Sequence, residues 1–272
     1  DWCAPIVVVP KPSGKIRLCV DLTKLNEAVK RELYPMPTVE STLGRIANGT
    51  VYTKLDANCG FYQIDLASEC RKLTTFITPI GRYMFTRLPY GLNSSSECFQ
   101  KRMDSILRDI PSVICHVDDI IISTSPEKHD ETLRLVLERL KEAGMTLNED
   151  KCVFSATKIE YLGQIIDNGG ISKDPKKVQA IVEYPAPRDQ TELRRFLGMA
   201  NQLMKFTPNL AEITKPLRDL LTKKSNWLWG SQQEKAFQKV KHDLSSDVVL
   251  AMYDPKRETL LSADSSSYGL GA

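Results

Sequence analysis

The sequence lacks long hydrophobic runs, has few histidines and carries little net charge. No stretch of 18 apolar residues occurs among its 272 residues, so no membrane-spanning helix and no membrane partner are expected. Three histidines and seven cysteines without a Cys-x-x-Cys pair offer no zinc-ligand spacing, and the odd cysteine count favours a reduced, intracellular setting. With 37 basic and 34 acidic residues the net charge is +3, so a nucleic-acid ligand would have to bind through local patches.

The composition is that of a globular protein. Hydrophobic residues make up 42% of the chain and charged residues 26%, which excludes disordered and collagen-like chains. A length of 272 residues suffices for about two domains. The chain starts without Met and stops in a strand-like run, so we expect a piece of a longer protein.

Runs of β-branched and aromatic residues predict a series of strands. Ile6–Val9 and Ile16–Leu22 flank a basic Pro/Gly turn and predict a hairpin. A strand over 51–55 ends at Asp56. Further strands are expected at Tyr62–Leu66, Thr74–Ile80, Tyr83–Leu88, Val113–His116, Ile120–Ile122, around Val153 and at Tyr161–Ile166.

Six helices are expected from apolar spacing and N-cap residues. Three of them lie over 38–48, from Asp174-Pro175 and over 231–245. A fourth follows Asn93, with Phe99, Met103 and Leu107 inward, and a fifth runs from Ser125 to Gly144, with Leu133, Val136, Leu137 and Leu140 inward. The sixth starts at Thr191 as N-cap, and its apolar side holds Leu193, Phe196, Leu197, Ala200, Leu203 and Met204. Segment 173–224 holds 11 Lys or Arg against 6 Asp or Glu, so positive charge concentrates there.

Three carboxylates fall at strand ends. Asp56 closes one strand, and Asp118 and Asp119 lie in the turn of a hairpin. Adjacent strands would bring them together, where their mutual repulsion calls for a cation. Mg²⁺ prefers such oxygen ligands, and two ions can serve a nucleotidyl transfer. The alternative is structural, because Asp is also a common turn residue.

Seven blocks of sequence resemble the reverse transcriptase of gypsy-like long-terminal-repeat retrotransposons. They occur in the order of that family and are Ala4–Lys11, Arg17–Leu22, Lys54–Asp56 with Gly60–Ile64, Leu88–Leu92, His116–Asp119, Tyr161–Gly163 and Leu193–Gly198. The resemblance implies an α+β right-hand polymerase with fingers, palm and thumb and an antiparallel palm sheet. The implied domains are fingers and palm over 1–172, a thumb-like segment over 173–226, a connecting helix over 227–247 and the start of a ribonuclease H-like domain over 248–272.

The resemblance also implies an RNA-directed DNA polymerase that adds dNMPs to a primer on an RNA or DNA template. Asp56, Asp118 and Asp119 would be catalytic and would hold two Mg²⁺ ions, with Mn²⁺ as a substitute, assisted by the Ala57 carbonyl. The dNTP would contact Arg17, Lys11 (or Lys15 in its place), Cys59, Gly60, Phe61 and Tyr90. Phe61 would exclude the ribose 2′-hydroxyl, although a Phe beside a Tyr is also typical of a core.

The primer end would be positioned by His116, Val117, Tyr161, Leu162 and Gly163. The partners implied are dNTPs, template and primer, and other pol polyprotein parts (protease, ribonuclease H, integrase). The setting implied is a cytoplasmic particle or the nucleus. Asp264 matches the first ribonuclease H carboxylate, but the later ones are missing, so no ribonuclease H activity is expected from this piece.

The sequence departs from the family pattern at two positions. His116 stands where Tyr is usual, and Tyr90 where Phe or Gln is usual. The chain could instead be an inactive retroelement relic that only binds nucleic acid, although its intact carboxylates argue against decay. An RNA-dependent RNA polymerase is the other alternative, against which Phe61 argues.

Overall fold

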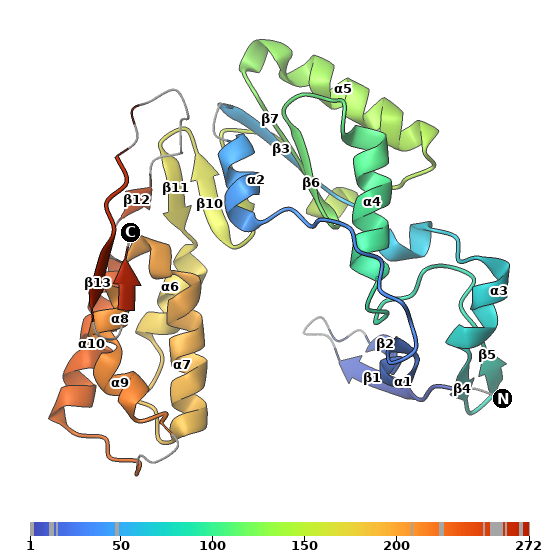
Figure 1. The fold of residues 1–272 in the computed structure, drawn as a ribbon. Coiled ribbons are helices and arrows are strands. Elements are labelled where there is room, and N and C mark those ends of the chain that lie inside the picture. Colours follow the sequence, from blue (N-terminus) through green and yellow to red (C-terminus); the bar gives the residue numbers. More distant parts are fainter. Residues whose placement is uncertain are drawn as a thin grey trace. The chain divides into compact units, whose positions relative to one another are not determined.

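The computed structural model describes residues 3–10, 14, 16–46, 49–207, 209–222, 226–246, 248–250, 258, 260–266 and 269–271. The chain divides into two compact units, Asp1–Thr157 and Lys158–Ala272 (Figure 1), and each is described by itself. No helix in these ranges is long and apolar enough to cross a membrane. The boundary between the units, after Thr157, comes before residue 172, where the sequence places the end of the fingers and palm. The subdomain limits expected from the sequence stay a prediction.

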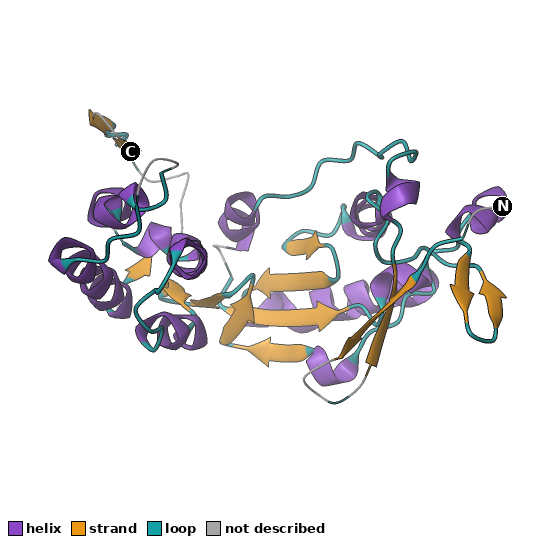
Figure 2. Cartoon of the chain, turned by 90° about the horizontal axis from the view of Figure 1, so that it is seen from below, coloured by secondary structure: helices purple, strands orange, loops and turns teal. Residues whose placement is uncertain are grey.

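A four-stranded antiparallel sheet forms the centre of the first unit (Figure 2). Its order is β6-β7-β3-β8, with bounds β3 Val51–Asp56, β6 Val113–His116, β7 Asp119–Thr124 and β8 Val153–Ala156. Ile120 and Ile122 face one side and Ile121 faces the other, and all three are fully buried. Strand β7 is therefore covered on both faces, which explains its unbroken apolar run.

Two helices cover the Ile120 and Ile122 side of the sheet. They are α4 (Ser95–Leu107) and α5 (Pro126–Glu142), and they contribute Phe99, Met103, Val136 and Leu140 to one core cluster. Pro126 opens α5 and Gly144, with φ 71°, follows its end, as the sequence predicts. Leu137 differs from the prediction because it is 37% exposed.

Shorter elements surround this layer. Hairpin β1 (Ile6–Pro10) and β2 (Ile16–Val20) has the predicted pairing, and a second hairpin pairs β4 (Phe76–Thr78) with β5 (Gly81–Tyr83). The remaining helices of the unit are α1 (Thr23–Asn26), α2 (Val39–Ile46), α3 (Ser68–Arg71) and the 3₁₀ turns η1 (Gly60–Gln63), η2 (Lys72–Thr74) and η3 (Glu149–Lys151).

Two strand predictions in this unit are wrong. The run Tyr62–Leu66 is not a strand, because its first residues lie in η1. Residues 84–88 are outside β5, although Arg87 forms an isolated bridge with Asp65. Aromatic packing overrides the β-propensity of these runs, since Phe61 turns into the core against Phe99 while Tyr62 stacks on Phe85.

A buried histidine links β3, β7 and α5. His129 is 2% exposed, and its ring nitrogens lie 2.7 Å from Thr53 Oγ1 and 2.8 Å from Thr124 Oγ1. Burial lowers the pKa of His129 below its ordinary value, although Asp130 opposes the shift. The neutral ring is therefore the form that this core accepts.

The free energy of unfolding is expected to decrease as the pH falls from 7 to 5. Below a pH of about 6.5 the unfolded chain binds a proton at His129, and the folded chain does so only at lower pH. Urea unfolding of wild type and His129→Gln at both pH values measures this. The stability gap between the two proteins should narrow at pH 5, and an unchanged gap would contradict the prediction.

The second unit combines a small sheet with helices. The sheet has the order β12-β11-β10-β9, with bounds β9 Lys158–Tyr161, β10 Gln164–Asp167, β11 Gly170–Lys173 and β12 Val249–Leu250. The single strand predicted over 161–166 is wrong, because Leu162 (φ 49°) and Gly163 (φ 72°) form a two-residue hairpin turn. A separate hairpin pairs β13 (Asp264–Ser266) with β14 (Gly269–Gly271).

The helices of this unit are α6 (Pro175–Val182), α7 (Gln190–Gln202), η4 (Met204–Phe206), α8 (Leu210–Ile213), α9 (Lys215–Asp219) and α10 (Ser231–Ser245). Helix α6 starts at Asp174-Pro175 as predicted, and the Asp174 side chain caps it by accepting the Lys176 N–H. Asp189, and not Thr191, caps α7, because its carboxylate accepts the Thr191 and Glu192 N–H groups. Of the residues expected inward, Met204 is instead 61% exposed.

Candidate active site

The strand register brings the three predicted carboxylates to one end of the central sheet. Asp56, the last residue of β3, lies opposite Asp119, the first residue of β7. Asp118 lies in the β6–β7 turn, and its carbonyl accepts the Ala57 N–H at 3.0 Å. The juxtaposition expected from strand ends is therefore present in the fold.

A buried glutamine holds the turn that carries Asp118. Val117 has φ 53°, a conformation that is costly for a β-branched residue. Its N–H donates to Gln100 Oε1 at 2.8 Å, and Gln100 Nε2 donates to the Cys115 carbonyl at 2.9 Å. Gln100 is fully buried on α4, and sequence reasoning missed it. A polar residue directly after the inward-facing Phe99 was the available signal.

The surroundings of Asp118 disfavour its ionised form. Burial, and then the charges of Asp56 and Asp119, raise the pKa of Asp118, while Lys151 opposes them. Its Oδ1 is buried without a hydrogen-bond partner among the described residues. Gly60 lies against it, and a Cβ there would overlap Asp118 Oδ1 and lie 2.8 Å from the Phe99 ring. Only glycine fits at position 60 without a shift of its neighbours.

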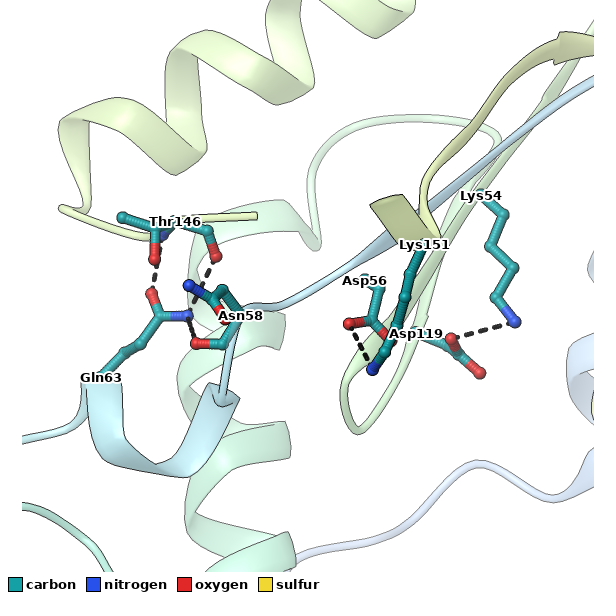
Figure 3. Close-up of polar contacts among 7 residues, drawn as sticks. All are labelled: Lys54, Asp56, Asn58, Gln63, Asp119, Thr146 and Lys151. Carbon is teal, nitrogen blue, oxygen red and sulfur yellow. Dashed lines mark hydrogen bonds and ion pairs between the residues drawn. The ribbon is translucent and has the colours of Figure 1, made fainter. Parts of the chain in front are cut away.

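Two lysines pair with the other carboxylates (Figure 3). Lys151 Nζ lies 3.0 and 3.2 Å from the two Asp56 oxygens, and Lys54 Nζ lies 3.2 Å from Asp119 Oδ1. Neither lysine was singled out from the sequence, because nothing in the spacing shows which cations reach the strand ends. Their ammonium groups supply part of the positive charge that these clustered carboxylates require.

The residues present fit a divalent cation by their chemistry. The three carboxylates, including the buried Oδ1 of Asp118 that has no partner among the described residues, are hard donors of the kind that Mg²⁺ prefers. Across the described residues, however, no group of three or more His, Cys, Asp or Glu side chains surrounds one ion position. Asp56 and Asp119 are instead paired with lysine ammonium groups.

An aromatic cluster lies beside the carboxylates. The rings of Phe61 and Tyr90 stack with centroids 4.7 Å apart, and Phe99 lies 5.6 Å behind Phe61. Phe61 is 7% exposed and Tyr90 is 40% exposed. Burial, and then the charge of Asp118, raise the pKa of Tyr90 to about 12. The structure thus brings Phe61 and Tyr90 together next to Asp118.

The remaining predicted site residues are spread over the chain. Cys59 is exposed with φ 50° and precedes Gly60 in η1. His116 is paired with Asp119 across the turn, and its Nδ1 is buried without a partner in the described ranges. Lys11 and Lys15 lie outside the described residues. For Arg17 the structure gives only the backbone, which pairs with Val9 in the β1–β2 hairpin.

The other predicted positions lie in the second unit. Tyr161 is fully buried at the end of β9, and Leu162 and Gly163 form the turn that follows. Asp264 begins β13, where its backbone pairs with Gly271. The roles assigned to all these residues stay predictions.

Comparison with known proteins supplies the family. The family model "Reverse transcriptase (RNA-dependent DNA polymerase)" matches residues 9–166, and "RNase H-like domain found in reverse transcriptase" matches residues 229–272. The Transposon Tf2-3 and Tf2-7 polyproteins of Schizosaccharomyces pombe are 33% and 32% identical over 271 residues, which is 98% of this chain. The chain spans 20% of their length.

Solved structures agree with this result. The foamy viral protease-reverse transcriptase in complex with dsDNA has a TM-score of 0.86 and 27% identity, covering 93% of this chain and 54% of that one. The same protein with an RNA/DNA hybrid has a TM-score of 0.83 and 26% identity, covering 93% and 35%. The fold is thus the α+β right-hand polymerase predicted from the motifs. The chain belongs to the reverse transcriptase family, as the motifs predict.

Proposed function

We propose that this chain catalyses RNA-directed DNA synthesis for a gypsy-like long-terminal-repeat retrotransposon, adding dNMPs to a primer 3′-hydroxyl. The observation that carries the proposal is the register of the central sheet, which sets Asp56 opposite Asp119 and beside Asp118. Ionised carboxylates that lie this close repel one another and destabilise the fold unless they bind a cation. The catalytic role of each carboxylate is part of the proposal.

The cofactor proposed is a pair of Mg²⁺ ions, for which Mn²⁺ would substitute. Asp56, Asp118 and Asp119 would hold them, with help from the Ala57 carbonyl, and Lys151 and Lys54 would give up their present ion pairs. Divalent ions bound there would supply activation of the primer hydroxyl and neutralisation of the leaving pyrophosphate.

The nucleotide is proposed to lie between η1 and the β1–β2 hairpin. The backbone of Cys59 and Gly60 would line the triphosphate, and Arg17, with Lys11 or Lys15, would bind its oxygens. Phe61 would lie under the sugar and Tyr90 near the templating base, which their stacking at 4.7 Å supports. The primer end would be positioned by His116, Val117, Tyr161, Leu162 and Gly163.

The proposed partners are template, primer and other parts of a pol polyprotein. The Tf2 relatives are polyproteins, and the foamy viral protein was solved with dsDNA and with an RNA/DNA hybrid. The excess of Lys and Arg over 173–224 suits contact with phosphates. A protease, a complete ribonuclease H and an integrase would come from the rest of the polyprotein. We also propose that the protein acts inside the cell, either in a cytoplasmic particle or in the nucleus.

The proposal is tested by primer extension on poly(rA)/oligo(dT) with dTTP and Mg²⁺. The wild-type chain should extend the primer, and EDTA should stop it. Absence of extension by a folded wild-type chain that still binds the duplex would contradict the proposal and support an inactive relic. Extension that continues in excess EDTA would contradict the metal assignment.

A further inference from the structure

The segment that follows Asp56 is held by backbone contacts on two sides. On one side the Ala57 N–H donates to the Asp118 carbonyl at 3.0 Å. On the other side the Asn58 N–H donates to the Thr146 carbonyl at 3.0 Å, and the Asn148 N–H donates to the Asp56 carbonyl at 2.9 Å. Residues 56–58 therefore lie between the β6–β7 turn and the segment after α5.

Beyond Asn58 the chain leaves this pairing and turns sharply. Cys59 takes a left-handed conformation with φ 50° and is exposed. Gly60 follows directly and passes against Asp118 and Phe99. An exposed turn in a disfavoured conformation needs an external restraint to keep one geometry.

Gln63 provides that restraint by reaching back from η1 (Figure 3). Its Nε2 donates to the Asn58 carbonyl at 2.7 Å and to the Thr146 carbonyl at 3.0 Å. Its Oε1 accepts the Thr146 N–H at 2.7 Å. One side chain thus closes the 58–63 loop on itself and fastens it to the segment after α5.

The site of these bonds indicates more than a role in folding. The side chain of Gln63 is only half-buried. Its three bonds all go to backbone groups at the edge of the candidate active site. The loop that they fix carries Cys59, Gly60 and Phe61, the residues proposed to meet the triphosphate and the sugar.

We propose that Gln63 is a positioning residue that presets the 58–61 loop for the incoming dNTP. The proposal rests on the proposed function, since it concerns the nucleotide side of that site. When the loop is already ordered, dNTP binding does not have to spend free energy on ordering it. Loss of the three Gln63 hydrogen bonds should therefore weaken dNTP binding more than it slows the chemical step.

Steady-state kinetics separate these effects. Gln63→Met keeps the length of the side chain and removes its donor and acceptor. On poly(rA)/oligo(dT), we expect the KM for dTTP to rise about tenfold while kcat stays within about twofold, and the Kd for the duplex to stay unchanged. Gln238→Met is the matched control, because the exposed Gln238 side chain on α10 bonds, among the described residues, only with Glu234 four residues earlier. An unchanged KM, or a fall in kcat alone, would overturn the proposal.

Hydrogen exchange gives a readout that does not depend on activity. In Gln63→Met the Thr146 amide should exchange at least about tenfold faster, whereas the Met145 amide, which donates to the Leu140 carbonyl at 2.8 Å, should keep its rate. If the wild type proves inactive, the proposed function fails, while the exchange rate of the Thr146 amide still shows whether the Gln63 hydrogen bonds hold the loop. Gln63→Asn, too short to span both carbonyls, repeats both measurements. Failure of both variants to fold would contradict a positioning role.

Discussion

Asp118→Asn is expected to abolish primer extension while making the metal-free protein more stable. The amide keeps the shape of the side chain and removes its negative charge. In the proposed mechanism that charge holds a divalent cation, so the rate should fall by about a hundredfold to a thousandfold, the scale of losing one preorganised electrostatic group. The loss should appear in kcat for every dNTP, because the chemical step itself is affected.

The gain in stability has a separate physical cause. Burial and the neighbouring Asp56 and Asp119 raise the pKa of Asp118, which means that the folded chain disfavours its ionised form. A neutral amide removes both the desolvation cost and the repulsion. In EDTA at neutral pH we expect Tm to rise by about 2–4 °C, which corresponds to roughly 1 kcal/mol in a chain of this size.

Two assays on one protein measure both effects. Primer extension is followed with Mg²⁺, and thermal unfolding is followed in EDTA. Asp219→Asn serves as the matched control, because Asp219 is an exposed carboxylate at the end of α9 and should change neither result. Extension by Asp118→Asn at the wild-type rate would remove Asp118 from the catalytic set. A lower Tm would show that its charge is compensated in the folded protein.

If the proposed function holds, Phe61→Val is expected to let this chain incorporate ribonucleotides. The Phe61 ring stacks on Tyr90 and backs onto Phe99, so it forms a fixed wall and not a mobile side chain. A wall of this kind rejects a 2′-hydroxyl by overlap, and discrimination of the order of a hundredfold can come from one such contact. Valine opens the space, whereas Phe61→Ala would also cost about 3–5 kcal/mol of stability because the side chain is buried.

The measurement is the ratio of kcat/KM for dTTP and UTP on the same primer and template. The ratio should fall at least about tenfold in Phe61→Val, mainly through better use of UTP. Phe154→Val is the control, because Phe154 on β8 is 49% exposed and lies outside the aromatic cluster. An unchanged ratio in a folded, active variant would show that Phe61 is only a core residue.

The sequence alone was enough for the features that depend on local chemistry. Alternation and β-branched runs predict β3, β6 and β7, because a strand buried on both faces has to be apolar throughout. Caps and apolar spacing predict α4, α5 and α6. Since Asp56 ends one strand and Asp118-Asp119 lie in the next hairpin, their meeting follows from pairing of the strands.

Only the tertiary structure decided what surrounds those carboxylates. Lys151 is 95 residues from Asp56 in the chain, and Gln63 is 83 residues from Thr146, so no local pattern relates them. Gln100 lies on a helix, but the group that it binds, the Val117 N–H, belongs to the turn of a neighbouring hairpin. The same reason explains why Tyr62–Leu66 resembles a strand but begins in a 3₁₀ turn. The sequence by itself was enough to select Asp56, Asp118 and Asp119 as the candidate carboxylates, and three-dimensional packing determined which side chains contact them and the neighbouring turns.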